Sequence, residues 1–327
     1  MASIRSTDFA SLTDDIQEVF NEVAKTSINE MVGKQVFRIM ETNRLTYDYV
    51  SLHGLNVIRQ VAEGEDFPSA EVQEGDNATW TQAQYAGKVA VTKKMRKFDM
   101  TDQIESVVRS IADEAFQLVD QSLADVLTNG FSSSNYTDVY GKSVVSTTPD
   151  AVALFSASHT NPINSETFRN LIRYNGSSNP VISREAIVEA RVDAMNYKDP
   201  AKVSRRVNLD TLLVAPAKED EAMRIAESQY ISGTNDNDIN PLKGKVKVVA
   251  WEKLTTRTGG TDTSAYWFMY DSKKVGESLR ALFSEKPTID PPEQVYANKS
   301  WEYTLDYFYT IGRAWPAYVR GSNAAGS

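Results

Sequence analysis

The fold is decided by residues 63–130, which read EGEDFPSAEVQEGDNATWTQAQYAGKVAVTKKMRKFDMTDQIESVVRSIADEAFQLVDQSLADVLTNG. Residues 63–79 are acidic and turn-rich, and they contain no Lys or Arg. Residues 84–100 have a strand-like and basic pattern, and residues 101–130 have the pattern of one long amphipathic helix. A long charged loop that returns through a strand into such a helix is costly to hold within a compact monomer. The order therefore favours a loop that lies on a neighbouring subunit.

The charges of the loop and of the strand are opposite, which makes both of them candidate intersubunit contacts. Complementary charge fixes the register of two surfaces more than it adds affinity. Basic residues on a strand also have a simpler explanation, because they keep an edge strand solvated and block unwanted pairing. The candidate contact residues are Glu63, Glu65, Asp66, Glu71, Glu74 and Asp76 in the loop, and Lys88, Lys93, Lys94, Arg96 and Lys97 in the strand.

The helix expected over residues 101–130 begins at Thr101 as N-cap and ends at Asn129-Gly130. At 1.5 Å per residue it is about 40 Å long. One face carries an apolar stripe at helical spacing: Ile104, Val107, Val108, Ile111, Ala115, Leu118, Val119, Ser122 and Val126. The other face is acidic and is expected to be solvated or to pair with the basic strand; it contains Asp102, Glu105, Asp113, Glu114, Asp120 and Asp125.

The composition is that of an ordinary globular protein, with 327 residues, 41% hydrophobic and 24% charged. The formal net charge of -9 argues against a dedicated nucleic-acid binder, although it is compatible with passive contact with packed DNA. The absence of cysteine excludes disulfides and thiolate chemistry. No signal peptide is recognisable, and no segment approaches the apolar run of about 18 residues that a membrane helix needs. We therefore expect a soluble protein without a membrane contact.

Elsewhere the chain alternates between helical and strand-like patterns. Residues 1–45 are expected to form an arm with an amphipathic helix, which lies either on its own subunit or on a neighbour. Helices are expected over 183–198, capped by Ser183, and over 216–227. Strands are expected over 46–58, 85–98, 209–215, 245–251 and 265–270, and a long hairpin over 278–283 and 301–314. Residues 233–240 are expected to form a polar loop, and 323–327 a loose tail.

No catalytic, cofactor or metal site is predicted. The chain has two histidines, His53 and His159, and no Gly-x-Ser-x-Gly sequence accompanies them. We interpret His159 as a hydrogen-bonded structural residue. Gly141-Lys142-Ser143 lacks the earlier glycine of a phosphate loop, and Asp236-Asn237-Asp238 lacks the glycine and distal glutamate of a calcium loop. The aromatic residues of 301–315 are expected to form sheet core, because no Lys or Arg is interleaved as in a base-stacking surface.

Three phrases of sequence, in this order, resemble the major capsid proteins of tailed bacteriophages, which have the Hong Kong 97-type fold. They are LFSASHTN at residues 154–161, LLVAPA at 212–217 and NPLKG at 240–244. The order of arm, charged loop, strand, long helix and α/β region also matches that fold. The resemblance implies an α+β subunit with an N-terminal arm (1–45), an extended loop (46–98), a peripheral domain (99–182 and 286–327) and an axial domain (183–285).

The resemblance also implies a function. It implies a non-enzymatic subunit that assembles into pentamers and hexamers, which form an icosahedral head shell around phage double-stranded DNA. A separate scaffold or protease, a portal and decoration proteins would be its partners, and assembly would occur in the cytoplasm of a bacterial host. An encapsulin-like compartment for protein cargo, a tail tube or sheath subunit and a soluble α+β hydrolase are the alternatives. No sequence feature carries over the lysine–asparagine crosslink of some relatives.

Overall fold

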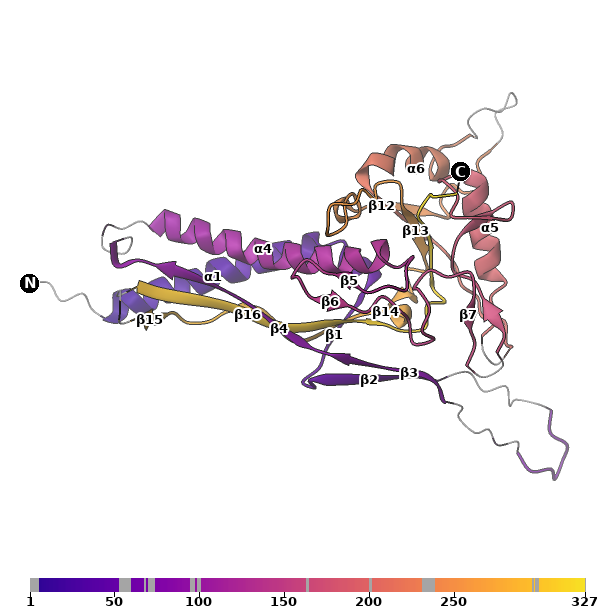
Figure 1. Ribbon diagram of the computed structural model, residues 1–327, viewed down its shortest axis with the longest axis horizontal. Coiled ribbons are helices and arrows are strands. Elements are labelled where there is room, and N and C mark those ends of the chain that lie inside the picture. Colours follow the sequence, from indigo (N-terminus) through magenta and orange to yellow (C-terminus); the bar gives the residue numbers. More distant parts are fainter. Residues whose placement is uncertain are drawn as a thin grey trace, which may run out of the picture.

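The computed structural model is an elongated α+β molecule from which a two-stranded ribbon projects (Figure 1). It describes residues 6–52, 60–67, 69, 74–94, 98, 101–162, 165–199, 202–230, 239–295, 297 and 300–326, without the side chains of 6–16, 101–103 and 105. One half contains two long helices and a long-stranded sheet, and the other half is a compact α/β region near the C-terminus. Some sequence predictions fall on residues outside these ranges. The predicted strand 46–58 and the predicted polar loop 233–240 are described only in part. His53, Asp236-Asn237-Asp238 and the last residue of the tail are not described.

Helix α4 (Thr101–Thr128) is the long helix expected from the sequence, and it ends at Asn129-Gly130. Helix α1 (Ser6–Glu30) packs along it, with Phe20 buried and the Ser27 hydroxyl donating a 3.1 Å hydrogen bond to Asp113. The helix of the arm therefore lies on α4 of its own chain. The apolar stripe of α4 is buried at Ile104, Val108 and Val119, but Val107 is 39% exposed.

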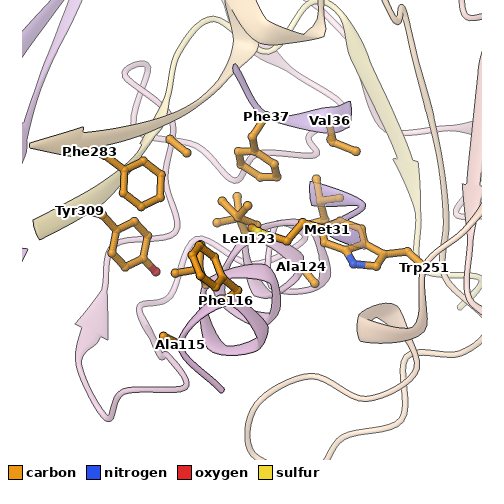
Figure 2. Packing of buried hydrophobic residues seen from close by; sticks show 14 of the residues in the cluster. Met31, Val36, Phe37, Ala115, Phe116, Leu123, Ala124, Trp251, Phe283 and Tyr309 are labelled. Atoms are coloured by element: carbon orange, nitrogen blue, oxygen red, sulfur yellow. The ribbon is translucent and has the colours of Figure 1, made fainter. Parts of the chain in front are cut away.

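The first sheet has five strands, in the order β1 (Arg38–Glu41), β14 (Leu279–Ile289), β16 (Ser300–Arg313) and β15 (Glu293–Val295), with β4 (Ala83–Val91) also paired to β16. β14 and β16 form the expected hairpin. Alternate residues of β16 face α4 and are buried, namely Tyr303, Leu305, Tyr307 and Tyr309. Tyr309 packs with Phe283 beside Phe116 and Leu123 of α4 (Figure 2). The expectation that these aromatics form sheet core is confirmed.

The second sheet has four strands, in the order β12 (Lys247–Ala250), β11 (Thr211–Val214), β13 (Trp267–Tyr270) and β17 (Val319–Ser322). Leu213 and Phe268 lie in the core that includes α4. Leu212 and Trp267 lie in a second core, which is completed by α5 (Arg184–Met195) and α6 (Glu219–Ala226). The Ser183 side chain caps α5 by accepting from the Ala186 N–H, as expected.

The other elements are short, apart from the ribbon strands β2 (Thr46–Leu52) and β3 (Glu74–Thr81). They are α2 (Gly33–Val36), β5 (Tyr136–Thr137), β6 (Ser143–Val144), β7 (His159–Thr160), β8 (Thr167–Phe168), β9 (Arg173–Tyr174), β10 (Ser177–Ser178), α7 (Val275–Ser278) and the 3₁₀ turns η1 (Pro216–Lys218) and η2 (Glu252–Leu254).

Several expected boundaries are corrected by the pairing of the strands. The acidic loop was expected over 63–79, but its last residues belong to β3, because Glu74 pairs with Leu52 of β2. The basic strand was expected to reach residue 98 or beyond, but β4 ends at Val91, and Lys93 and Lys94 lie in a helical turn. Met95 lies outside the described residues.

The membership of the two sheets also differs from the expected division into domains. β4 was expected in the extended loop and pairs with β16. The first residues of β14 were assigned to the axial part, but the whole strand lies in the five-stranded sheet. β17 was expected in the peripheral part and is the edge strand of the four-stranded sheet. These pairings join residues far apart in the chain, so no local sequence pattern predicts them.

Candidate functional site

The ribbon of β2 and β3 is the candidate contact surface. Its strands are antiparallel, from Thr46 opposite Thr81 to Leu52 opposite Glu74, and they extend away from both sheets (Figure 1). An isolated two-stranded ribbon is marginally stable in water. The base of the ribbon therefore needs an anchor on the body of the subunit.

The anchor is aromatic. The ring of Trp80 stacks on those of Tyr47 and Tyr49, with ring centroids 5.8 and 5.4 Å apart. The Arg280 guanidinium lies 5.0 Å from the centre of the Tyr49 ring and donates a 3.4 Å hydrogen bond to the Tyr47 hydroxyl. Aromatic stacking and cation–π contacts each contribute about 0.5–1.5 kcal/mol beyond the burial of area. The base of the ribbon is thus fixed to β14.

A glycine of β16 makes this anchor possible. A Cβ atom at Gly312 would lie 2.4 Å from Cε3 of Trp80, which is closer than any real contact, so only glycine lets the indole ring lie against the strand. The backbone N–H of Trp315 also donates a 3.4 Å hydrogen bond to the Tyr49 hydroxyl. Burial raises the pKa of that hydroxyl, which keeps it protonated.

Farther from the base, the ribbon exposes apolar and acidic side chains. Val50 is 41% exposed, and Phe67, in the segment between the strands, is 88% exposed. Asp76 is half-buried beside Ser51, whose hydroxyl donates to the Asp76 carbonyl at 3.0 Å, and burial raises the pKa of the Asp76 carboxyl. These exposed apolar and acidic groups make the outer part of the ribbon a candidate contact surface.

The structure describes five of the six acidic candidates. Glu63, Glu65, Asp66 and Glu74 are exposed, whereas Glu71 lies outside the described residues. The Glu65 carboxylate accepts a 3.1 Å hydrogen bond from the Ala62 N–H. Among the described residues, none of these five acids forms an ion pair. Their charge is therefore available to a second molecule.

The basic candidates lie elsewhere on the molecule. Lys88 of β4 forms a 3.0 Å ion pair with Glu302 of the neighbouring strand β16. Lys93 and Lys94 are exposed after the end of β4, and Arg96 and Lys97 lie outside the described residues. β4 runs away from the ribbon toward the start of α4 (Figure 1). The described acidic and basic residues are consequently near opposite ends of the elongated subunit, and Lys88 does not pair with α4.

The acidic face expected on α4 is only partly solvated. Asp113 and Glu114 are exposed, but Asp120 and Asp125 are 3% and 0% exposed. Asp120 accepts hydrogen bonds from the Trp251 indole N–H at 2.7 Å and the Gly33 N–H at 2.9 Å. Asp125 accepts from the N–H and the hydroxyl of Thr258, at 3.0 and 2.5 Å. Burial raises the pKa of both carboxyls. The expectation of solvation was wrong for these two.

His159 has the structural role that we expected. It is fully buried, with Nδ1 2.7 Å from an Asp150 carboxylate oxygen and Nε2 3.1 Å from Oδ1 of Asn170. Burial raises the pKa of Asp150, but the hydrogen bond and charge of His159 outweigh it and lower this pKa overall. The Asn170 oxygen also accepts from the Ser156 N–H. These bonds hold the loop of 154–161 against the second sheet.

The described part of the chain contains no helix long and apolar enough to cross a membrane. Within the same residues, no group of three or more His, Asp or Glu side chains is placed to hold a metal ion.

Comparison with known proteins identifies the class. A family model described as phage capsid protein matches residues 75–320, which is most of the chain. The capsid of the cyanophage P-SCSP1u matches with a TM-score of 0.56 at 9% identity, covering 91% of this chain and 89% of that one. The mature capsid of bacteriophage PhiM1 matches with a TM-score of 0.54 at 10% identity, covering 90% and 86%.

The virus-like particle from Pyrococcus furiosus matches with a TM-score of 0.50 at 8% identity, covering 94% of this chain and 98% of that one. No curated protein matches the sequence. At these identities the structural matches establish the fold alone, which is the Hong Kong 97-type capsid fold.

The family match identifies the class of protein as a capsid shell subunit. The chain belongs to the phage capsid protein family. It is a non-enzymatic, homo-oligomeric component of the virion head, as the resemblance implied.

The aromatic anchor was missed by the sequence reasoning, although one signal was present. Tyr47 and Tyr49 are on the same face of a strand, and Trp80 precedes the next strand closely. Such alternating aromatics indicate a packed face, but their partners Arg280 and Gly312 are more than 200 residues away and have no local signature.

Proposed function

We propose that the chain is a major capsid protein whose noncovalent contacts build pentamers and hexamers, and that these close into an icosahedral shell around phage double-stranded DNA. The observation that carries the proposal is the ribbon, which is anchored at its base and presents unpaired acids and exposed Phe67 at its far end. A surface of this kind is accounted for by a second copy on which it lies.

The charge distribution supports head-to-tail contacts between copies. The acids of 63–66 and the lysines at 93–94 are near opposite ends of the subunit (Figure 1). Two different surfaces that meet between identical subunits form a heterologous interface, which generates a ring when the rotation closes. We propose that the acidic ribbon of each copy lies on the next one and that Lys93 and Lys94 contact another neighbour.

Contacts of this kind would stabilise the shell because each subunit takes part in several of them. A specific interface typically buries about 1,200–2,000 Å², and several modest interfaces per subunit reinforce one another once a ring has formed. The proposal includes separate scaffold or protease, portal and decoration proteins, and assembly in the cytoplasm of a bacterial host. Contact with DNA is proposed to be non-specific, which agrees with the net charge of -9.

A shell for protein cargo is the second candidate. The observation in its favour is the match to the virus-like particle from Pyrococcus furiosus, which spans nearly all of both chains. The family match to phage capsid proteins favours the first candidate. Particles purified from the native source distinguish the two, because DNA content supports the first and a co-purified cargo enzyme supports the second.

The contact role of the ribbon is tested by neutralising its acids. The variant Glu63→Gln/Glu65→Gln/Asp66→Asn keeps the ribbon and removes three charges. The control is Asp220→Asn/Glu227→Gln/Glu252→Gln, which removes three exposed charges from the α/β region and its adjoining η2 turn. Negative-stain electron microscopy at low and moderate salt counts rings, closed shells and free subunits.

We expect the control to assemble like the wild type and the ribbon variant to remain as soluble subunits or open fragments. Normal shells from the ribbon variant would show that these acids do not hold the contact. Rods, or a stable small oligomer from the wild type, would contradict the capsid function itself.

A further inference from the structure

The strongest unexplained feature lies in the α/β region, at a buried arginine. Arg320 of β17 is 3% exposed, and its Nε and Nη1 atoms have no hydrogen-bond partner among the described residues. Burying a charged group without a partner is costly. An unpaired guanidinium in a core is therefore expected to have a partner beyond the described residues.

Arg313 shows what an arginine with a purely structural role looks like in the same protein. It is also buried, at 5% exposed. Its guanidinium donates to the Val145 carbonyl and, at 2.9 Å, to the Tyr136 hydroxyl, and it lies 5.7 Å from the centre of the Tyr136 ring. Both Nη atoms of Arg313 are thus satisfied and only its Nε has no partner among the described residues, whereas Arg320 has no such partner for Nε or Nη1.

Arg320 lines a cavity of about 320 Å³ between β8, β9 and the C-terminal end of α5. This volume suits a small group and is at the lower end for ligand pockets. Tyr197 also lines the cavity and is 6% exposed, and its hydroxyl accepts a 2.8 Å hydrogen bond from the Trp315 indole N–H. Burial raises the pKa of Tyr197 to about 12, so its own proton remains available for donation.

Burial also lowers the pKa of Arg320 to about 10, which leaves the guanidinium charged at neutral pH. The cavity thus offers a buried cation and a hydroxyl donor to one occupant. Hydrogen bonds from a charged donor to an oxyanion are roughly twice as strong as neutral ones. The occupant that this chemistry selects is an oxyanion.

The remaining charges of the cavity decide which oxyanion fits. Its described wall carries four basic and three acidic side chains. Each acid is already in an ion pair, Glu166 with Lys202, Asp193 with Arg173 and Asp199 with Arg205. Of the wall cations outside these pairs, Arg320 alone is buried, since Arg169 is half-buried and Lys198 is exposed. A single buried cation matches a monoanionic carboxylate, whereas a dianionic phosphate would bring in a second buried charge without a partner.

We propose that the cavity at Arg320 is a carboxylate-binding site, in which Arg320 and Tyr197 hold one carboxylate group. The carboxylate comes either from a small free acid or from an Asp or Glu side chain of a second copy of this chain. The site stands on its own geometry and does not depend on the function proposed above.

The test measures the melting temperature of the full chain in sodium acetate, chloride and phosphate at equal ionic strength. A ligand that binds only the folded state raises this temperature. Because phosphate also stabilises folded proteins without binding a site, the effect of the cavity is the part of each shift that Arg320→Met loses. We expect acetate to raise the melting temperature of the wild type by about 2 °C relative to chloride at saturating concentration, and the part lost in Arg320→Met to be larger in acetate than in phosphate. Arg320→Met should lose the acetate effect, and Arg224→Met, which alters an exposed arginine of α6, should keep it.

In chloride, Arg320→Met should melt no lower than the wild type, because it removes an unpaired buried charge. Tyr197→Phe is a second variant that leaves the guanidinium in place, and we expect it to need several-fold more acetate for the same shift. The proposal is overturned if acetate and chloride give the wild type equal melting temperatures. A shift lost in Arg320→Met that is larger in phosphate than in acetate, or an unchanged acetate effect in both cavity variants, also overturns it.

The source of the carboxylate is decided by repeating the measurement on assembled particles. If a second copy fills the cavity, acetate stabilises the unassembled chain and has no effect on the particle. If a small free acid is the occupant, acetate stabilises both. Either result supports the site and identifies its partner.

Discussion

Asp120 is the residue at which the long helix is joined to the rest of the subunit. Its two carboxylate oxygens accept from Gly33, at the start of α2, and from Trp251, before η2. A Cβ at Gly33 would lie 2.7 Å from an Asp120 oxygen, so the backbone approaches as closely as glycine allows. One buried side chain thus connects three segments that are far apart in the sequence.

We predict that Asp120→Ala lowers the free energy of unfolding by about 2–6 kcal/mol, because two buried N–H donors lose their acceptor at about 1–3 kcal/mol each. Chemical denaturation of the unassembled chain measures this change. The matched control is Glu114→Ala on the exposed side of the same helix, which should cost less than about 1 kcal/mol. Equal costs for the two variants would contradict the assigned role.

The same carboxyl makes the stability depend on pH in a defined direction. Burial raises the pKa of Asp120 above its value of 3.8, so the folded protein holds this proton more tightly than the unfolded chain. The stabilisation that the raised pKa of Asp120 gives the folded state is complete below about pH 3.8 and is lost as the pH rises through the raised pKa. The cost of Asp120→Ala should therefore shrink between pH 4 and neutral pH, as denaturation at a series of pH values would measure. A cost that grows with pH would contradict this sign.

Among the elements, the ribbon depends on its anchor. We predict that Gly312→Ala loosens the base of the ribbon, because the added methyl group would overlap the Trp80 ring. Limited proteolysis should cut the variant faster in the segment between β2 and β3, with the rest of the subunit unchanged. Gly87→Ala in β4 is the control, since its Cβ would meet only Ile111 at an ordinary 3.8 Å. Equal cleavage of both variants would argue against the anchor.

The ion pair between Lys88 and Glu302 joins β4 to β16, and it contributes less to stability than the aromatic anchor of the ribbon. The Lys88 side chain is 66% exposed, and exposed pairs are worth about 0–1 kcal/mol. We predict that Lys88→Ala changes the free energy of unfolding by less than about 1 kcal/mol and leaves shell formation intact, as denaturation and electron microscopy would measure. Loss of assembly in this variant would return Lys88 to the set of intersubunit contacts.

The elements that could be predicted are those set by local pattern. The apolar stripe of α4 and the alternating aromatics of β16 follow the helical and strand periods directly. The unpredicted features depend on partners distant in the chain, such as Thr258 for Asp125, 133 residues away. An acid on a helix is expected in water unless a buried donor is known, so the sequence alone favoured the wrong environment for Asp125.

For the whole molecule, we predict that the early steps of assembly slow as salt is added. The acids of the ribbon and the lysines at the other end are exposed, and exposed charges are screened over about 8–10 Å at moderate salt. Light scattering during assembly at a series of salt concentrations measures the rate. An assembly rate that does not depend on salt would indicate that the first association of subunits is driven by apolar contacts such as those of Phe67. The ribbon variant without its three acids should lose most of the salt dependence.

The candidate contacts could be predicted as a set of charges, but not as a surface. The sequence placed Glu63 and Lys88 only some 25 positions apart, and the return through β4 separates them in space. Their separation follows from the pairing of β4 with β16, a partner more than 200 residues away.

The position of β17 has a consequence for how the protein is made. During synthesis, β11, β12 and β13 emerge before β14 and β16, and the strand that completes their sheet emerges after both. Until then Trp267–Tyr270 has one unpaired edge, which is the kind of edge that invites aggregation. A nascent chain is therefore unable to present a finished subunit to its neighbours until residues 319–322 have been translated, so premature assembly on the polysome is delayed by the order of the strands.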